Sequence, residues 1–391
     1  MVAVKDGTCC IYCDEPLEGG GSLEHIWPQG LGGAACPDPW RSNDVCRKCN
    51  SKAGLWVDGP FLKGSFTFHE KRISNEAFIG NSVIDRAGYT YMGQERSFPC
   101  SPEELSEFWL GPSGETCRFV HADDGERWAT YAGGNPMDRK KRDPGRVYLS
   151  LVDRGQVRAL MALASVCRTF PKARVHCLTQ LTGLPPKLAD RLIRGVERSK
   201  IEDREIEWIR NDAPQEVQVR ATISTNFEQR FLGKLALGVG ANLLGRAHLS
   251  TSYAASLRDL FHTGKGNEVR GAGYWQEGLA VPLGLEGAWT LSLWAIGDLA
   301  LFVTSPSGKN MMIVVAPADS ITDDLRNRFG DGQSWVIVPI RRFCSEPIAL
   351  PDLIAHSLNG LPVPQLGRLS EWRSEAEQLW AAEETERENA G

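Results

Sequence analysis

The chain has 391 residues and a formal net charge of −5, and 42% of its residues are hydrophobic. This length allows two or three domains with a sizeable core, and the charge argues against a globally basic nucleic-acid binder. No hydrophobic run is as long as a membrane span, and the segment from Met1 to Thr8 lacks a hydrophobic signal sequence. We therefore expect a cytoplasmic protein without a membrane partner.

The first 64 residues are rich in glycine and cysteine, which is typical of a domain held by a metal rather than by a core. Cys10 and Cys13 form one C-x2-C pair, and Cys46 and Cys49 form another. Four thiolates bind Zn²⁺ tetrahedrally and leave no open position, so such a zinc would be structural. Cys9 also adjoins Cys10, but the two-residue spacing favours Cys10. The alternative is a set of buried free cysteines.

Residues 65–145 carry many aromatic and turn residues, which predicts short strands and loops with one helix at Glu103–Trp109. The basic run Arg139–Arg142 is typical of an exposed turn, with a DNA contact as the alternative. The segment His121–Glu126 is a weaker candidate for a metal site.

Residues 146–391 alternate between helical and strand patterns. We expect helices at Gln156–Phe170, Pro185–Lys200, Phe227–Leu244, Ser252–Phe261 and Ser370–Arg387. We expect strands at Val147–Val152, Arg174–Leu181, Glu216–Thr225, Leu279–Leu283, Trp289–Ile296, Leu299–Val303, Met311–Ala316 and Trp335–Ile340. A hairpin turn is expected at Ser305–Gly308.

Two charged features stand out in this region. Arg230 and Lys234 lie one turn apart on an otherwise hydrophobic helix, which indicates salt bridges at the helix edge or contacts in a nucleic-acid or nucleotide pocket. From Leu369 to Gly391 seven acidic residues outnumber two arginines. This acidic helix is a candidate docking element for a homo-oligomer or an activating partner.

A second constellation accompanies the two cysteine pairs. Glu24 and His25 lie between the pairs and precede Pro28, and Asn50 directly follows the last cysteine. If a helix runs from Asn43 to Lys52, it can bind zinc and still present Asn50 to a second site. Asn43 would then either cap that helix or serve the second site.

These residues together resemble the HNH endonucleases of the ββα-metal (His-Me finger) superfamily, and most of all the two-knuckle zinc subgroup of the endonuclease VII type. The shared pattern comprises both C-x2-C pairs, Glu24-His25, Pro28, Gly32-Gly33, Asn43, Asn50 and Lys52. It covers roughly the first 55 residues. Many relatives have Asp where this chain has Glu24, and many have His where it has Asn50.

The resemblance implies a role for each residue. His25 would be the general base, and Glu24 and Asn50 would bind one Mg²⁺ or Mn²⁺ ion. Asn43 would orient the His25 loop by hydrogen bonding. Zinc would be bound by the four paired cysteines Cys10, Cys13, Cys46 and Cys49. His25 as a merely structural histidine is the alternative.

Arg47, Lys48 and Lys52 share the expected helix and are candidates for phosphate contacts, with a solvated helix face as the alternative. The chemistry suits phosphodiester hydrolysis, because a neutral imidazole can act as a base near pH 7 and a hard cation stabilises the charge that develops.

The expected fold class is α+β. A small zinc-stapled ββα-metal nuclease domain (1–64) would be followed by an aromatic-rich connecting region (65–145) and a larger mixed α/β region (146–391). The function hypothesis is a metal-dependent DNA endonuclease, with RNA also open as a substrate, acting as an effector of a defence system or a mobile element. The alternative is a non-catalytic zinc module that binds nucleic acid or protein. An enzyme in the C-terminal region ranks last, because that region shows no phosphate loop, nucleophile elbow or dinucleotide fingerprint.

Overall fold

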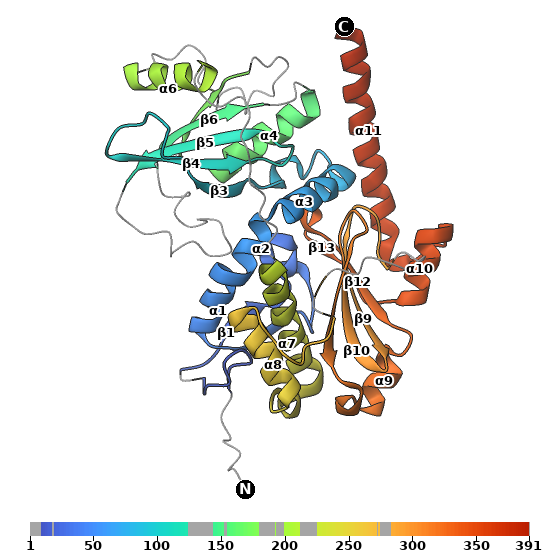
Figure 1. Ribbon diagram of the computed structural model, residues 1–391. Helices are drawn as coiled ribbons and strands as arrows, with labels where there is room; N and C mark the ends of the chain where they lie inside the picture. Colours follow the sequence, from blue (N-terminus) through green and yellow to red (C-terminus); the bar gives the residue numbers. More distant parts are fainter. Residues whose placement is uncertain are drawn as a thin grey trace. The chain divides into compact units, whose positions relative to one another are not determined.

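The computed structural model describes residues 9–17, 19–123, 144–151, 155–179, 192, 199–211, 225–271, 273 and 283–390. It has the expected α+β class, with an N-terminal ββα region followed by a larger mixed α/β region (Figure 1). The chain divides into two compact units, each made of two sequence segments. The first unit comprises Met1–Phe78 and Ile223–Glu371, and the second comprises Ile79–Thr222 and Trp372–Gly391. The domain limits predicted after residues 64 and 145 stay a prediction.

The ββα region consists of β1 (Ser22–His25), β2 (Arg41–Val45) and α1 (Arg47–Ala53). The two strands pair antiparallel, with Glu24 opposite Ser42 and His25 opposite Arg41. The prediction of a helix from Asn43 was wrong, because residues 41–45 pair with β1 and the helix begins only after Cys46. Asn43 therefore lies on a strand, and the helix cap is Cys46, whose Sγ accepts a hydrogen bond from the Cys49 amide.

The loop between β1 and β2 explains the predicted glycine pair. Gly32 has a φ of +93°, a conformation that side chains rarely adopt. Gly33 lies so close to the main chain that a Cβ atom would stand 1.7 Å from the Trp27 carbonyl oxygen. Both positions therefore require glycine.

The rest of the first unit is built from helices and one antiparallel sheet in the order β11-β10-β9-β12-β13, with β14 also paired to β12. Its helices are the π-helical turn η3 (Gly54–Asp58), α2 (Gly59–Lys63), α3 (Ser65–Phe78), α7 (Thr225–Leu249), α8 (Ser252–Thr263), α9 (Asp323–Phe329), α10 (Leu350–Asn359) and the first turn of α11 (Gly367–Ala390). Its strands are β9 (Trp289–Ile296), β10 (Asp298–Thr304), β11 (Asn310–Ala316), β12 (Gln333–Val338), β13 (Phe343–Cys344) and β14 (Ile348–Ala349).

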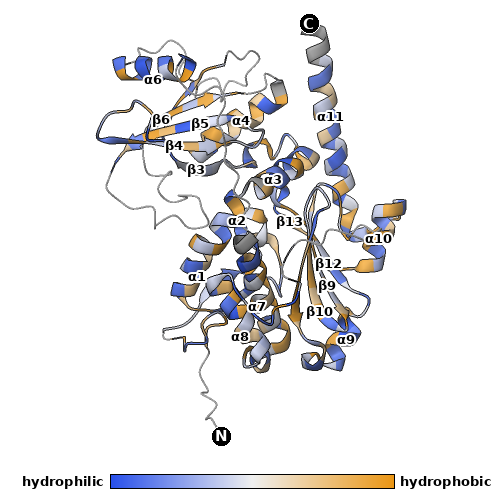
Figure 2. Ribbon diagram, viewed as in Figure 1, coloured by the Kyte–Doolittle hydropathy of each residue, from blue (hydrophilic) through white to orange (hydrophobic). Residues whose placement is uncertain are grey.

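Successive side chains of β10 point to opposite faces of the sheet, and both faces are buried. Leu299, Leu301 and Val303 pack in the core that includes α7 and α8, whereas Ala300 and Phe302 pack with α10 on the other face. The strands β9, β10 and β12 are accordingly mostly hydrophobic in Figure 2. The four long strands and the turn at Ser305–Gly308 confirm the sequence predictions, as do α7 and α8.

The N-terminal region shares this core instead of relying on metal alone. Trp27 packs against Phe231 of α7 and Trp289 of β9, with ring centroids 5.9 and 5.5 Å apart. Tyr12 stacks on Phe261 of α8 at 4.6 Å. The expectation of a zinc-held domain with little core was therefore wrong, because its core partners come from more than 150 residues further along the chain.

The second unit contains a five-stranded sheet in the order β3-β4-β5-β6-β7, antiparallel except for the β6–β7 pair. Its elements are β3 (Thr90–Gln94), β4 (Glu104–Leu110), β5 (Thr116–Ala122), β6 (Gly145–Ser150), α4 (Gln156–Thr169), β7 (Arg174–Cys177), α6 (Lys200–Asn211) and the remainder of α11. The helix predicted at Glu103–Trp109 was wrong. This segment pairs with strands on both sides, and that pairing overrides its helical composition.

Several predicted segments lie outside the described residues: all or most of Pro185–Lys200, Glu216–Thr225 and Leu279–Leu283, the basic run Arg139–Arg142, and the end of the His121–Glu126 segment. Across the described ranges, no helix combines the length and the hydrophobicity needed to span a membrane.

Candidate functional site

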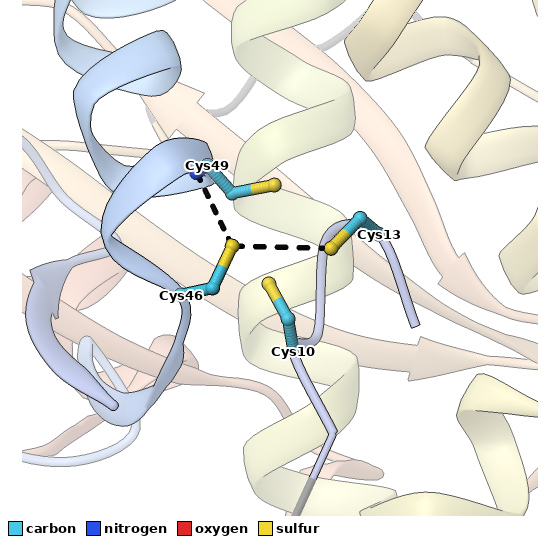
Figure 3. Close-up of side chains that lie close together, drawn as sticks. All are labelled: Cys10, Cys13, Cys46 and Cys49. Carbon is cyan, nitrogen blue, oxygen red and sulfur yellow. Dashed lines mark hydrogen bonds between the residues drawn. The ribbon is translucent and has the colours of Figure 1, made fainter. Parts of the chain in front are cut away.

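The two cysteine pairs form one compact cluster. The four Sγ atoms of Cys10, Cys13, Cys46 and Cys49 lie within 4.8 Å of one another (Figure 3). The Sγ atoms of Cys13 and Cys46 are 3.9 Å apart, and a tetrahedral zinc site with Zn–S bonds of about 2.3 Å needs sulfur atoms about 3.8 Å apart. The cluster therefore fits a structural Zn²⁺ ion, and it contains Cys10 as predicted rather than Cys9.

The thiols of this cluster share their protons unevenly. The hydrogen bond from Cys49 lowers the pKa of Cys10 to about 4, whereas burial raises the pKa of Cys13 to about 11. The hydrogen bond to Cys10, together with burial, in turn raises the pKa of Cys49. Such a set readily exchanges its remaining protons for a dication.

His25 lies at the end of β1 with its side chain half-buried. The Gln29 amide Nε2 is 3.2 Å from the imidazole Nδ1. Burial lowers the pKa of His25, and the charges of Arg41 and Lys234 lower it further against the opposing effect of Glu24. The imidazole is therefore neutral at pH 7, the form that a general base requires.

Glu24 precedes His25 and is only 3% exposed. Its Oε1 atom lies 2.8 Å from the Lys234 ammonium and 3.4 Å from the Tyr12 hydroxyl, which donates to it. Its second oxygen, Oε2, accepts no hydrogen bond from a described residue. One half of the carboxylate is thus engaged within the protein and the other half is open.

Asn50 joins α1 to β1. Its amide Nδ2 donates to the Ser22 Oγ at 3.0 Å and to the Leu23 carbonyl oxygen at 2.9 Å. The Leu23 carbonyl directly precedes Glu24 in the strand, so Asn50 is anchored beside the Glu24-His25 pair. The amide oxygen Oδ1 accepts no hydrogen bond from a described residue.

The donor set can be compared with what a catalytic Mg²⁺ or Mn²⁺ requires. Such ions prefer hard oxygen ligands and need few of them from the protein. Glu24 Oε2 and Asn50 Oδ1 are two oxygens of this kind. The other terminal atom of each side chain is held by the protein, Glu24 Oε1 by Lys234 and Asn50 Nδ2 by Ser22 and Leu23. The residues present therefore fit a hard divalent cation.

Asn43 occupies a different position. It is exposed on β2, and within the described residues its side chain makes no hydrogen bond to the His25 loop. It lines a hollow of about 690 Å³. The lining residues are Leu23, Asp38, Pro39, Arg41, Ser42, Asn43, Asp44, Asn242, Leu243 and Arg328. The role expected for Asn43 stays a prediction.

The three basic residues of α1 differ in their surroundings. Arg47 and Lys48 are exposed at the start of the helix. The Lys52 Nζ instead lies 3.0 Å from the Nδ1 of His262 on α8. Their contacts with nucleic acid stay predictions, and Lys52 has a contact within the protein as well.

Two residues of the site were not predicted to belong to it. Lys234 comes from α7, 209 residues after His25, and Asp58 ends η3. The only sequence signal for Lys234 is a lysine within a hydrophobic stretch. It forms a buried salt bridge with Asp58 and Glu24, whereas Arg230 donates to the Phe261 and His262 carbonyls at the end of α8. Asp58 carries no local sequence signal that we recognise.

Burial and the neighbouring charges shift the pKa values of Asp58 and Lys234. Burial raises the pKa of Asp58 to about 6, against the opposing effect of the Lys234 ammonium. Burial also acts to lower the pKa of Lys234, but the carboxylates of Asp58 and Glu24 more than offset it, so that pKa lies above its usual value.

Comparison with known proteins supports the interpretation of the N-terminal region. Residues 10–66 match a family model described as HNH endonuclease. Neither the curated proteins nor the solved structures contain a match to the chain. The matched segment includes the four cysteines, the Glu24-His25 pair and Asn50. Residues 10–66 are therefore an HNH endonuclease domain that carries a four-cysteine cluster suited to structural zinc.

Proposed function

We propose that this protein is a metal-dependent endonuclease that hydrolyses phosphodiester bonds of DNA. The observation that carries the proposal is the placement of Asn50, whose amide is bonded to the carbonyl just before the Glu24-His25 pair. This bond ties Asn50, whose amide oxygen could bind a metal ion, to the strand that carries Glu24 and His25, within a segment that matches HNH endonucleases. RNA as a substrate, the endonuclease VII subtype and a role in defence or in a mobile element stay hypotheses.

In this mechanism His25 accepts the proton of the water that attacks the phosphorus. Burial, assisted by the charges of Arg41 and Lys234 and opposed by Glu24, lowers the pKa of His25 and keeps the ring unprotonated until that transfer. Glu24 and Asn50 would hold a Mg²⁺ or Mn²⁺ ion. That ion would stabilise the negative charge that develops on the phosphoryl and leaving oxygens.

The zinc cluster has a structural part in this proposal. A four-thiolate zinc site has no open position for substrate or water. Cys49 is directly followed by Asn50, so the ion would fix the start of α1 and thereby the position of the Asn50 side chain.

Plasmid cleavage in Mg²⁺ or Mn²⁺ tests this function. Loss of a general base lowers the rate by about 10²- to 10⁴-fold, which is the expected effect of His25→Ala. His356→Ala is a suitable control, because His356 is on α10 and, among the described residues, its ring forms a hydrogen bond only with the Leu361 carbonyl. Equal cleavage by wild type and His25→Ala would reject the proposal.

The salt bridge of Glu24 favours one alternative, a non-catalytic zinc module that binds nucleic acid or a partner. In such a module Glu24 would serve only to anchor β1 on Lys234. Wild-type protein that binds DNA but leaves duplex, branched and single-stranded substrates uncut in both metals would establish this alternative.

A further inference from the structure

Lys234 contacts both residues of the Glu24-His25 pair. Its Nζ atom is fully buried and lies 2.8 Å from Glu24 Oε1 and 3.0 Å from the main-chain oxygen of His25. It also donates to both carboxylate oxygens of Asp58, at 2.8 and 2.9 Å. All of these residues belong to the first unit.

The use of a lysine here needs a reason. Its neighbours on α7 are fully buried hydrophobic residues, Leu232, Leu235 and Ala236. An aliphatic side chain would suit the position, because no charged group would then have to leave water. A buried ammonium is tolerated only when charged and polar partners compensate it. An ammonium group has three donors, and its three partner groups here are Glu24, Asp58 and His25.

The charges in this cluster do not cancel. Glu24 and Asp58 supply two carboxylates, whereas Lys234 supplies one ammonium. When all three are ionised, one negative charge remains, and Glu24 Oε2 is the oxygen without an internal donor. Lys234 thus fixes the orientation of the Glu24 carboxylate, while the remaining negative charge can still attract a cation.

We propose that Lys234 is a positioning residue of the nuclease centre. It fixes the Glu24 carboxylate through Oε1, so that Oε2 is directed to the divalent ion, and it holds the end of β1 through the His25 carbonyl. Asp58 orients Lys234 through two hydrogen bonds. The inference rests on the proposed function and extends it, because α7 then contributes to a centre otherwise formed by residues 10–66.

Partners of metal ligands have measurable effects on the metal. Removing a residue that orients a ligand typically lowers metal affinity or activity by 10- to 100-fold. We therefore expect Lys234→Met in the full chain to bind Mn²⁺ about 10- to 100-fold more weakly and to need correspondingly more Mn²⁺ for half-maximal cleavage. Mn²⁺ binding is measured by calorimetry or by the electron paramagnetic resonance of the free ion, and zinc content and circular dichroism report the fold.

Lys309→Met is the control variant. Lys309 pairs with Glu70, a fully buried glutamate of the same unit, at 3.5 Å. Its loss should leave Mn²⁺ affinity unchanged. Should Lys234→Met fail to fold, Asp58→Asn takes its place, since it keeps the lysine but weakens its anchor, and weaker Mn²⁺ binding is again expected.

The outcomes separate the inference from the function on which it rests. Folded Lys234→Met with unchanged or tighter Mn²⁺ binding would overturn the inference, as would wild-type protein that binds no Mn²⁺. If wild type cleaves DNA in a His25-dependent way while Lys234→Met shows the wild-type Mn²⁺ dependence, only the inference fails. If Lys234 governs Mn²⁺ binding but no nucleic acid is cut, the positioning role holds and the proposed function fails.

Discussion

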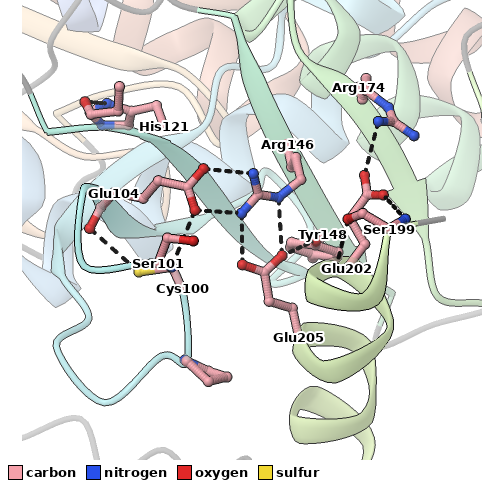
Figure 4. Close-up of polar contacts among 12 residues, drawn as sticks. Cys100, Ser101, Glu104, His121, Arg146, Tyr148, Arg174, Ser199, Glu202 and Glu205 are labelled. Atoms are coloured by element: carbon pink, nitrogen blue, oxygen red, sulfur yellow. Dashed lines mark hydrogen bonds and ion pairs between the residues drawn. The ribbon is translucent and has the colours of Figure 1, made fainter.

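The two units each bury a cluster of charged side chains, and the clusters differ in what they leave open. In the second unit Arg146 lies between two glutamates (Figure 4). It donates to both oxygens of Glu104 and to both oxygens of Glu205, and Tyr148 also donates to Glu205. In the first unit one oxygen of Glu24 accepts no hydrogen bond from a described residue. Only the cluster in the first unit keeps an oxygen for a ligand.

A second group of charged side chains in this unit, around Glu202, is also closed. Ser199 and Glu202 form a reciprocal cap at the start of α6. The side chain of each accepts a hydrogen bond from the main-chain amide of the other. Glu202 also pairs with Arg174 of β7 and with the imidazole of His176. These contacts attach α6 to the sheet, so this network has a structural role.

The largest effect should come from removing zinc. Binding of structural zinc contributes on the order of 10 kcal/mol in small zinc domains. Cys46→Ser should lose the ion and unfold the ββα region, and because that region shares its core with α7 and β9 the whole first unit should be destabilised. Zinc stoichiometry and thermal unfolding measure this.

The neighbouring Cys9→Ser is the control for this change, since Cys9 lies outside the four-cysteine cluster. It should keep zinc and stability. A folded Cys46→Ser protein that retains one equivalent of zinc would contradict the cluster assignment.

A pair of glutamine substitutions tests whether the two clusters differ in metal binding. Breaking a buried ion pair costs about 3–5 kcal/mol, so Glu205→Gln should lower the free energy of unfolding by up to that amount. Below its melting temperature it should cleave DNA with the wild-type Mn²⁺ dependence. Glu24→Gln should also be destabilised, but in addition it should lose cleavage at moderate Mn²⁺ concentrations. Equal Mn²⁺ dependence in the two variants would show that Glu24 has no greater part in metal binding than Glu205.

Acid should act chiefly on the first unit. Both ring nitrogens of His248 on α7 are buried without a hydrogen-bond partner among the described residues, and burial lowers the pKa of His248 to about 4. In the unfolded chain the pKa is near 6.5, so the unfolded state binds the extra proton first and stability falls as the pH drops from about 6.5 to 4.

The loss over this range is about 3 kcal/mol at most. His121 and His176 of the second unit differ, because each has a glutamate within 3.3 Å. Denaturant unfolding at pH 7 and pH 5 should show a smaller difference for His248→Phe than for wild type. The same difference in both proteins would exclude His248 as the cause.

The smallest effect concerns the basic residues of α1. Arg47→Ala should weaken DNA binding a few-fold and reduce the slope of log affinity against log salt by about 1. Lys52→Ala should change the slope less, because Lys52 contacts His262 within the protein. Fluorescence anisotropy at several salt concentrations measures both slopes, and identical slopes for all three proteins would show that Arg47 does not contact phosphate.

Local sequence patterns were sufficient for part of the site. The two C-x2-C spacings predicted the four-cysteine cluster, because cysteines three positions apart in a knuckle lie close together. Short, mostly hydrophobic runs likewise predicted β9 to β12, where both faces of the sheet are buried. Glu24, His25 and Asn50 could be named from their resemblance to HNH endonucleases.

Contacts between distant segments could not be read from the sequence. The pairing of β1 with β2 keeps Asn43 out of the helix, and no local pattern of residues 43–52 reports that pairing. Glu104–Leu110 has residues that also suit a helix, and only the neighbouring strands make it β4. The approach of Lys234 to Glu24 joins residues 210 positions apart, so it depends on the packing of α7 against the N-terminal region.

The most direct measurement is the anomalous scattering of a crystal of the full chain soaked in Mn²⁺. Our expectation is a manganese peak within coordination distance of both Glu24 Oε2 and Asn50 Oδ1, beside the His25 ring, and a separate zinc peak among the four cysteines as the internal control. A crystal that shows the zinc peak but no manganese next to Glu24 and Asn50 would contradict it.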